Sequence, residues 1–329
     1  MRPPDFWSQN DPAANTIAAA LSPLGLVYGA SVAWKHRFAS PYRARAAVVC
    51  IGNLTVGGTG KTPLTIAVAR ALAEQGVPVA CLARGYGRRS AFPMLVDANL
   101  HDAGMVGDEA LLLAQSAPTV VARDRAEGAR LAVAHGARAI VMDDGHQNFA
   151  LAKDLSLVAV DGEAAFGNGR IIPAGPLRES VAQGLRRADA LVVMGAGDPA
   201  LPRFAGPILR ARLAGERRFD GRRVTAFAGI GRPAKFFDSL RAAGAEIVQC
   251  HSYGDHHVYS ESEIAALRNA AKRADSILVT TEKDFVRLSP AQREGVDMLP
   301  VRAVFDDASA FAQLIDSLLA KSPGGSAAL

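Results

Sequence analysis

The sequence predicts an α/β fold, in which an apolar N-terminal helix precedes a mostly parallel sheet lobe and a second, smaller α/β lobe. Three observations lead to this prediction: an uncharged stretch near the N-terminus, short apolar runs that alternate with helical stretches after residue 45, and a glycine-rich loop after the first run. The chain has 329 residues, of which 49% are hydrophobic and 21% charged, so disordered and collagen-like chains are excluded.

The N-terminal stretch has no charged residue from 12 to 34, and cations follow at Lys35, Arg37, Arg43 and Arg45. It is long enough to cross a bilayer, although Pro23 and two glycines weaken that interpretation. We favour a helix lying in the membrane interface, with a spanning helix and a buried helix as alternatives. The cations favour contact with an anionic cytoplasmic leaflet, so residues 1–40 are predicted to associate with the membrane.

The rest of the chain divides into two series of predicted elements. The first has strands at 46–51, 77–82, 119–121 and 139–142, and helices at 61–75, 108–115 and 124–135. The second has strands at 155–160, 190–194, 224–228, 247–250 and 277–280, and helices at 234–242, 261–273 and 308–320. We therefore expect one lobe over residues 41–150 and a second over 151–299, which closes over the cleft between them. Residues 300–321 could return to complete the first lobe.

A glycine-rich loop follows the first predicted strand, and a predicted helix begins directly after it. The loop reads Thr55-Val56-Gly57-Gly58-Thr59-Gly60-Lys61-Thr62. Glycines let backbone N–H groups surround a polyphosphate, and a helix N-terminus adds positive potential. The first lobe is therefore predicted to be of the P-loop NTPase type, although Thr55 stands where the usual motif has glycine. Lys61 is expected to reach the β- and γ-phosphates of ATP, and the Thr62 hydroxyl to bind Mg²⁺.

An acidic pair follows the strand predicted at 139–142. Asp143 and Asp144 would hold or orient Mg²⁺ and its water shell, as the acidic partner of a phosphate loop does. A strand that merely enters a turn would give the same pattern. The loop alone leaves kinase, switch GTPase and partition-type ATPase open, and ATP is favoured because no guanine-binding signature is evident.

Further motifs carry a resemblance to a known family. They follow the loop at residues 84–88 (Arg-Gly-Tyr-Gly-Arg), 106–109 (Val-Gly-Asp-Glu), 122–125 (Ala-Arg-Asp-Arg), 143–147 (Asp-Asp-Gly-His-Gln), 167–170 (Gly-Asn-Gly-Arg), 173–179 (Pro-Ala-Gly-Pro-Leu-Arg-Glu), 255–257 (Asp-His-His) and 281–284 (Thr-Glu-Lys-Asp). With the loop at 52–63, the chain closely resembles the tetraacyldisaccharide 4'-kinases of lipid A assembly. His146 and Asn148 depart from the residues usual in that family.

The resemblance implies a reaction and its partners. The reaction is transfer of the ATP γ-phosphate to the 4'-hydroxyl of a tetraacyldisaccharide 1-phosphate, which gives lipid IV-A and uses Mg²⁺. The expected location is the cytoplasmic face of the inner membrane, with a glycolipid substrate and no nucleic-acid partner; the net charge of +5 indicates an anionic partner only weakly. A nucleotide-switch ATPase is the alternative, but such proteins use a lysine where this chain has Val56.

The resemblance also implies roles for individual residues. Asp108 is expected to accept the proton of the sugar hydroxyl, supported by His256, although Asp108 could instead cap a helix. Arg178 would contact the γ-phosphate and Glu179 would add a metal-binding carboxylate from the second lobe, unless they are a helix-start glutamate and a solvated arginine. The residues expected to grip the 1-phosphate or the glucosamine units are Arg84, Tyr86, Arg88, Arg123 and Arg125.

Overall fold

The computed structural model describes residues 4–7, 11–85 and 92–321, and it contains two sheets. The strands of the first sheet are β1 (Ala47–Gly52), β2 (Val79–Ala83), β3 (Met94–Leu95), β4 (Thr119–Val121), β5 (Ala139–Met142), β6 (Leu155–Asp161), β7 (Ala190–Met194), β8 (Ile208–Gly215) and β13 (Val301–Phe305). Their order is β13-β8-β7-β6-β1-β5-β2-β4-β3. Neighbours are parallel except at the two edges, where β3 and β13 are antiparallel to the adjacent strand. The predicted mostly parallel α/β sheet is confirmed.

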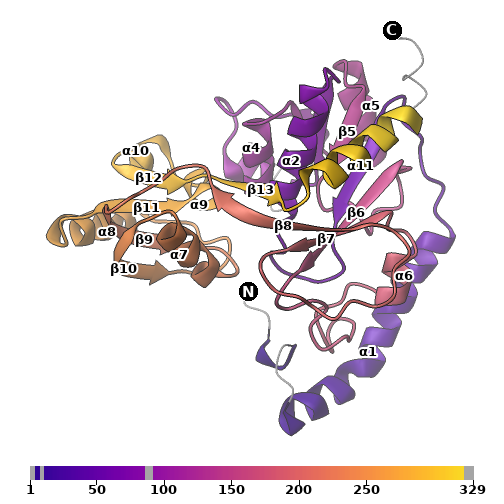
Figure 1. Cartoon of the computed structure of the whole chain (residues 1–329), viewed down its shortest axis with the longest axis horizontal. Helices are drawn as coiled ribbons and strands as arrows, with labels where there is room; N and C mark the ends of the chain where they lie inside the picture. The colour runs from indigo at the N-terminus through magenta and orange to yellow at the C-terminus, as the bar shows by residue number, and fades with distance from the viewer. Residues whose placement is uncertain (1–3, 8–10, 86–91, 322–329) are drawn as a thin grey trace.

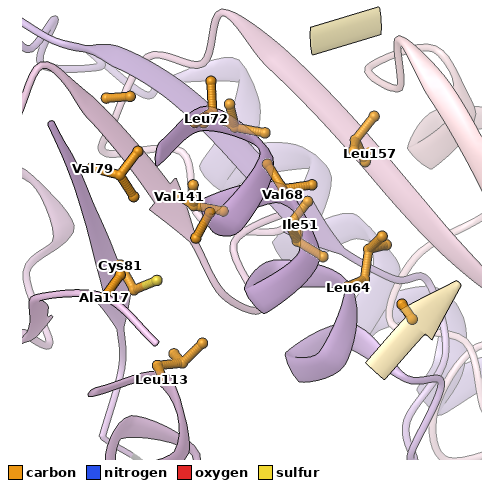
Figure 2. Close-up of a cluster of buried hydrophobic side chains, with 14 of the residues drawn as sticks. Ile51, Leu64, Val68, Leu72, Val79, Cys81, Leu113, Ala117, Val141 and Leu157 are labelled. Atoms are coloured by element: carbon orange, nitrogen blue, oxygen red, sulfur yellow. The ribbon is translucent and has the colours of Figure 1, made fainter. Parts of the chain in front are cut away.

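Helices cover both faces of this sheet and form the large lobe with it. They are α2 (Lys61–Glu74), α3 (Ala103–Val106), α4 (Asp108–Ala114), α5 (Arg125–Ala134), α6 (Val181–Leu185) and α11 (Ala308–Lys321). Alternate residues of each buried strand face opposite sides, as the two-residue period of a strand requires. Ile51 packs with Leu64 and Leu72 of α2 (Figure 2), and Val49 belongs to the same buried cluster. Val48 packs on the opposite face, which α5 covers.

The second sheet is the centre of a small lobe, which lies at the left in Figure 1. Its strands are β9 (Arg223–Ala228), β10 (Glu246–Ser252), β11 (Ile277–Thr281) and β12 (Val296–Leu299), all parallel, in the order β10-β9-β11-β12. Its helices are α7 (Pro233–Ala242), α8 (Glu261–Arg273), α9 (Glu282–Phe285) and α10 (Pro290–Arg293). Phe236 of α7 and Ile264 of α8 lie in two separate buried clusters.

The division between the lobes differs from the predicted boundary near residue 150. β1 lies between β5 and β6 and pairs with both, so the strands at 155–161, 190–194 and 208–215 extend the large sheet. The small lobe spans about residues 219–299, and β13 and α11 then return to the large lobe. The apolar sequence of a strand does not reveal which sheet it joins. For this reason the predicted boundary between the lobes, near residue 150, is too early in the chain. The strand β8 was not predicted because its exposed positions include Arg210 and Arg212.

The N-terminal stretch forms the 26-residue helix α1 (Pro12–Arg37), after a short 3-10 turn η1 (Asp5–Trp7). Asp11 caps α1 by accepting a hydrogen bond from the N–H of Ala14 at 2.9 Å. The helix is long and apolar enough to cross a membrane, and only 17% of its most apolar 18-residue window is buried. Leu26 and Val27 are about 70% exposed (72% and 70%), so the alternative of a buried helix is wrong. In Figure 1, α1 lies against the large lobe, away from the small lobe.

Candidate active site

The phosphate loop connects β1 to α2 at the carboxyl end of the central strand. The buried amide of Asn53 supports it, because Nδ2 donates to the Thr55 carbonyl oxygen at 2.7 Å and to Thr59 Oγ1 at 3.0 Å. Gly60 has a φ of 77°, and a Cβ atom there would lie 2.9 Å from the end of the Met194 side chain. The positive φ is the observation that favours glycine here, since the flexible Met194 side chain could move away from a Cβ atom. The helix α2 begins immediately after it, with its N-terminal N–H groups beside the loop.

A pair of threonines on α2 contacts the first acidic residue after β5. The Thr62 hydroxyl donates to Asp143 Oδ2 at 3.2 Å, and the Thr65 hydroxyl donates to Asp143 Oδ1 at 3.1 Å. β1 and β5 are adjacent parallel strands, so the loop and Asp143 meet at the same edge of the sheet. Lys61 Nζ lies 3.7 Å from Asp144 Oδ1. The structure thus brings together four predicted residues from two chain segments.

Arg178 reaches the same place from a third segment. The chain before it pairs with the loop: the Val56 N–H donates to the Pro176 carbonyl oxygen, and the Arg178 N–H donates to the Leu54 carbonyl oxygen, both at 2.8 Å. Arg178 Nη1 then donates to Asp144 Oδ1 at 2.8 Å. We call Lys61, Thr62, Asp143, Asp144 and Arg178, together with the loop at 55–60, the phosphate site.

The charges of the phosphate site act strongly on one another. Burial lowers the pKa of Lys61, and the carboxylates of Asp144, Asp143 and Glu109 oppose this effect. Burial and the charge of Asp144 raise the pKa of Asp143. Burial alone would raise the pKa of Asp144 as well, but Lys61 and Arg178 bring it below its ordinary value. The site therefore holds an ionised Asp144 between two cations, one of which is the loop lysine.

A second cluster forms where the small lobe meets α4. Asp108 is 4% exposed, and its Oδ2 atom accepts from Arg287 Nε at 2.9 Å and from Arg287 Nη2. His256 Nδ1 lies 3.1 Å and Lys283 Nζ lies 3.7 Å from the same oxygen, and Lys283 is 2.7 Å from Glu109 Oε1. We call these five residues the acceptor cluster. Its two acids belong to the large lobe and its three basic residues to the small lobe.

The basic residues control the ionisation of the acids in this cluster. Burial alone would raise the pKa of Asp108, but hydrogen bonds with the side chains of His256 and Glu109, together with the charges of Lys283 and Arg287, hold it far below its ordinary value. Burial and the adjacent Asp108 raise the pKa of Glu109. Asp108 is therefore ionised at neutral pH, next to a carboxyl group that ionises much less readily.

A metal ion is a poor occupant for the acceptor cluster. One ligand atom each from Asp108, Glu109 and His256 lie within 4.8 Å of one another, which is a spacing that could suit a cation. However, Arg287 and Lys283 already neutralise both carboxylates. The cluster is thus better suited to positioning a polar group than to binding a metal ion.

A sequence profile of the tetraacyldisaccharide-1-P 4'-kinase family matches residues 17–320 of the chain. The chain belongs to this family. A tetraacyldisaccharide 4'-kinase of Rhodospirillum rubrum is 49% identical over 97% of this chain and 98% of its own length. One of Methylobacterium radiotolerans is 52% identical over 97% of this chain and 99% of its own length.

A solved structure agrees with this tetraacyldisaccharide 4'-kinase family assignment. The fold is similar to that of LpxK from Aquifex aeolicus, crystallised in complex with ATP, with a TM-score of 0.76 and 25% sequence identity. The similarity covers 92% of this chain and 99% of that one. Both lobes of the kinase fold are therefore included in the comparison.

Glu179 has a partner other than the one expected for it in such a kinase. Its side chain is 1% exposed, and Arg187 Nη2 donates to both of its carboxylate oxygens, at 2.6 and 2.7 Å. Gln147 Nε2 donates to the same carboxylate at 2.9 Å. This corrects the expectation of a metal-binding Glu179 from the second lobe, because the residue belongs to the large lobe and its charge is already paired.

The five residues expected to bind the kinase substrate lie in different surroundings or outside the described residues. Arg125 is 2% exposed and donates to the carbonyl oxygens of Ala122 at 2.7 Å and Asp143 at 3.3 Å. It supports the backbone of the phosphate site, so its predicted contact with substrate is corrected. Arg84 and Arg123 are exposed. Tyr86 and Arg88 lie outside the residues that the structure describes.

Sequence reasoning missed part of the acceptor cluster. Asp108 and His256 were predicted, but Glu109, Lys283 and Arg287 were assigned no role. Lys283 lies inside the motif at 281–284, and that motif was the available signal. The helix-cap alternative for Asp108 is wrong, because α4 begins at Asp108 and Gly107 occupies the cap position.

Proposed function

We propose that this chain transfers the γ-phosphate of ATP to the 4'-hydroxyl of a tetraacyldisaccharide 1-phosphate, which gives the lipid A precursor lipid IV-A. The observation that carries the proposal is the position of the two sites: Lys61 begins α2, Asp108 begins α4, and these two helices pack against each other. A phosphate donor held by one and a hydroxyl held by the other would lie side by side. The family membership and the relatives named above support the choice of substrate.

In the proposed reaction the phosphate site holds the nucleotide. The N–H groups of the loop and of the first turn of α2 would bind the β- and γ-phosphates, and Lys61 would leave Asp144 to contact them. Arg178 contacts the same Asp144 oxygen as Lys61 and would bind the γ-phosphate. The segment that carries Arg178 pairs with the loop, and Lys61 directly follows the loop, so rotation of the two side chains would bring both cations to the phosphates.

The residues present also fit a magnesium ion. Thr62 Oγ1 and Asp143 Oδ2 lie 3.2 Å apart in the structure, and Mg²⁺ prefers such oxygen ligands. Asp144 lies beside them and would orient the surrounding water. When bound, Mg²⁺ would neutralise negative charge on the phosphate oxygens.

The acceptor cluster would activate the sugar hydroxyl. As the hydroxyl oxygen attacks the γ-phosphorus and the bond to ADP breaks, Asp108 would accept the hydroxyl proton. His256 would hold the carboxylate in place, since its Nδ1 atom lies 3.1 Å from Asp108 Oδ2. The low pKa of Asp108 keeps the acid in the ionised form that this role requires.

The proposed substrate is a lipid, and α1 offers a place of contact with the membrane. Apolar residues such as Leu24, Leu26 and Val27 are exposed along the helix, and Lys35 and Arg37 follow in its last turn. Cations beside an apolar helix favour an anionic bilayer surface. ATP is cytosolic, so the proposed location is the cytoplasmic face of the inner membrane. Deletion of residues 1–35 should move the protein from the membrane to the soluble fraction; retention on the membrane would place the anchor elsewhere.

The test of the reaction uses the purified full chain in detergent, with ATP labelled on the γ-phosphate. Tetraacyldisaccharide 1-phosphate should become labelled, and the deacylated disaccharide 1-phosphate should be a far poorer acceptor. The nucleotide-switch alternative predicts ATP hydrolysis that does not depend on lipid. If inorganic phosphate is the only labelled product, with or without lipid, the kinase proposal is refuted.

A further inference from the structure

Arg287 lies just after α9 in the small lobe, and its guanidinium joins two carboxylates from different lobes. Its side chain is 7% exposed. Nε and Nη2 donate to Asp108 Oδ2 of the large lobe, while Nη1 donates to Asp284 Oδ1 of the small lobe at 2.9 Å. Nη1 also donates to the Gly229 carbonyl oxygen at 2.9 Å. All three nitrogens of the guanidinium are thus used.

Asp284 is a rigid support for this arginine. The residue is fully buried, and its Oδ2 atom accepts from the Gly229 N–H at 3.0 Å and from the Thr281 hydroxyl at 2.7 Å. The Tyr259 hydroxyl donates to Oδ1 at 3.0 Å. Because a planar guanidinium binds carboxylates in fixed directions, a fixed Asp284 also fixes the direction in which Arg287 points.

We propose that Arg287 is a positioning residue for phosphoryl transfer, which ties the Asp108 carboxylate to the small lobe and holds it ionised and correctly oriented only while the lobes are together. The inference rests on the proposed function, since it assigns Asp108 the hydroxyl proton. Arg287 itself contacts neither nucleotide nor substrate in this account, and acts through Asp108.

The charged groups around Asp108 determine what Arg287 adds. From the small lobe, Arg287, Lys283 and His256 face the carboxylate, and from α4 only Glu109 does. Among them, Arg287 alone donates two hydrogen bonds to Asp108. Without it, the remaining lysine and histidine would leave a buried carboxylate less stabilised, so Asp108 would bind a proton at a higher pH.

A purely structural contact between the lobes would have different consequences, and the chain offers a matched control for it. Asp161 at the end of β6 in the large lobe pairs with Arg232 at 2.7 Å and Lys235 at 3.1 Å, both at the start of α7 in the small lobe. This second ion-pair cluster also joins the lobes, but no contact links it to Asp108 in the described part of the chain. A variant at Arg232 therefore weakens the lobe contact without removing any of the groups that contact Asp108.

The experiment measures kcat and KM of the full chain from pH 5 to 9 for wild type, Arg287→Gln, Arg287→Lys and Arg232→Gln. Arg287→Gln should lower kcat about 100-fold, at unchanged KM for ATP, as expected when general-base catalysis is impaired. Wild type should show no acid limb from Asp108 in this pH range, because the carboxyl group stays ionised far below its ordinary pKa. In Arg287→Gln the effect of burial is opposed less strongly, so an acid limb should enter the range from below. Arg287→Lys keeps the charge and should remove that acid limb again, though it should restore only part of kcat. Arg232→Gln should show no acid limb from Asp108 in this range, as in wild type.

Each other outcome contradicts the inference in a recognisable way. If Arg287→Gln has the wild-type pH profile, or if Arg232→Gln shows the same acid limb, Arg287 is only a structural contact. Should Arg287→Gln not fold, by its melting curve, the Arg287→Lys variant decides: an acid limb that enters the range despite the retained charge overturns the inference. A wild-type enzyme that labels no acylated disaccharide refutes the proposed function instead, and so the two failures are distinct.

Discussion

The phosphate site and the acceptor cluster are built in different ways. Lys61, Asp143 and Arg178 come from segments that meet at one edge of the large sheet, so the phosphate site is complete within one lobe. In the acceptor cluster, Asp108 belongs to the large lobe and its basic partners to the small lobe. The first site is therefore formed before any ligand binds, whereas the second exists only while the lobes are in contact. Nucleotide binding and catalysis should consequently be separable by mutation.

The largest effect is expected at the phosphate site. Lys61→Ala removes the cation nearest the transferred phosphate and should lower kcat by about 10³-fold or more, the scale of a cation that stabilises the transition state of phosphoryl transfer. Asp144 keeps Arg178 as a partner, so the melting temperature should change little. Arg70→Ala, at an exposed position of the same helix, is the control and should retain activity. Near-normal turnover by Lys61→Ala would contradict the proposal that the loop at 55–62 binds the phosphates of ATP.

Asp108→Asn tests the acceptor cluster in the same way. It should lower kcat by about 10²–10³-fold, because an amide cannot accept the hydroxyl proton. The KM for ATP should stay close to that of wild type, since none of the contacts of the phosphate site involve Asp108 in the described residues. Steady-state kinetics with saturating lipid measure both constants. A large increase in the KM for ATP would mean that the two sites are not separable.

A smaller effect is expected from weakening the contact between the lobes away from both sites. Asp161→Asn removes one carboxylate that pairs with Arg232 and Lys235, whose side chains are each 40% exposed. Ion pairs with exposed partners contribute about 0.2–1 kcal/mol each, so kcat should fall about two- to thirtyfold. Asn at this position keeps the size of the side chain. If kcat does not change at all, lobe contact does not limit the acceptor cluster.

The smallest effect concerns stability against pH. Burial, helped by the charges of Lys153 and Arg187, lowers the pKa of His146 to about 3, below the unfolded value of about 6.5. The unfolded chain therefore binds the extra proton first, and stability is lost as pH falls from about 6.5 towards 3. Between pH 7.5 and 5.5 this one group costs wild type about 1.4 kcal/mol of unfolding free energy. His146→Phe keeps an aromatic ring but cannot bind the proton. Its unfolding free energy, measured with urea, should therefore lack this decrease between pH 7.5 and 5.5.

The His146 measurement also sharpens the comparison between the sites. His146 packs against Gly52, the last residue of β1, which leads into the phosphate loop. A Cβ atom on Gly52 would lie only 2.5 Å from the Cβ atom of His146. The region beneath the phosphate site should thus respond to pH below 6.5, while Asp108 stays ionised far below its ordinary pKa. An equal loss of stability at pH 5.5 in wild type and His146→Phe would contradict the buried, neutral histidine.

The same comparison explains how much could be predicted from the sequence. Lys61, Thr62 and Asp143 follow neighbouring parallel strands. Because the carboxyl ends of parallel strands lie at the same edge of a sheet, the sequence order alone predicts that these residues meet there. The partners of Asp108 depend on how two separately packed lobes meet, which no periodicity in the chain records. Arg125 was assigned to the substrate because a sequence does not reveal burial of a single arginine. The lobe boundary was wrong for a related reason, since β6 could belong to either sheet.

The separation of the two sites is tested most directly by the affinity for ATP, measured by calorimetry in the presence of Mg²⁺ and without lipid. Asp108→Asn should bind ATP within about threefold of wild type, and Lys61→Ala at least about tenfold more weakly, because a charge-assisted hydrogen bond contributes about 1.5–3 kcal/mol. Equal losses of affinity in the two variants would contradict the account, because they would mean that ATP binding requires both lobes.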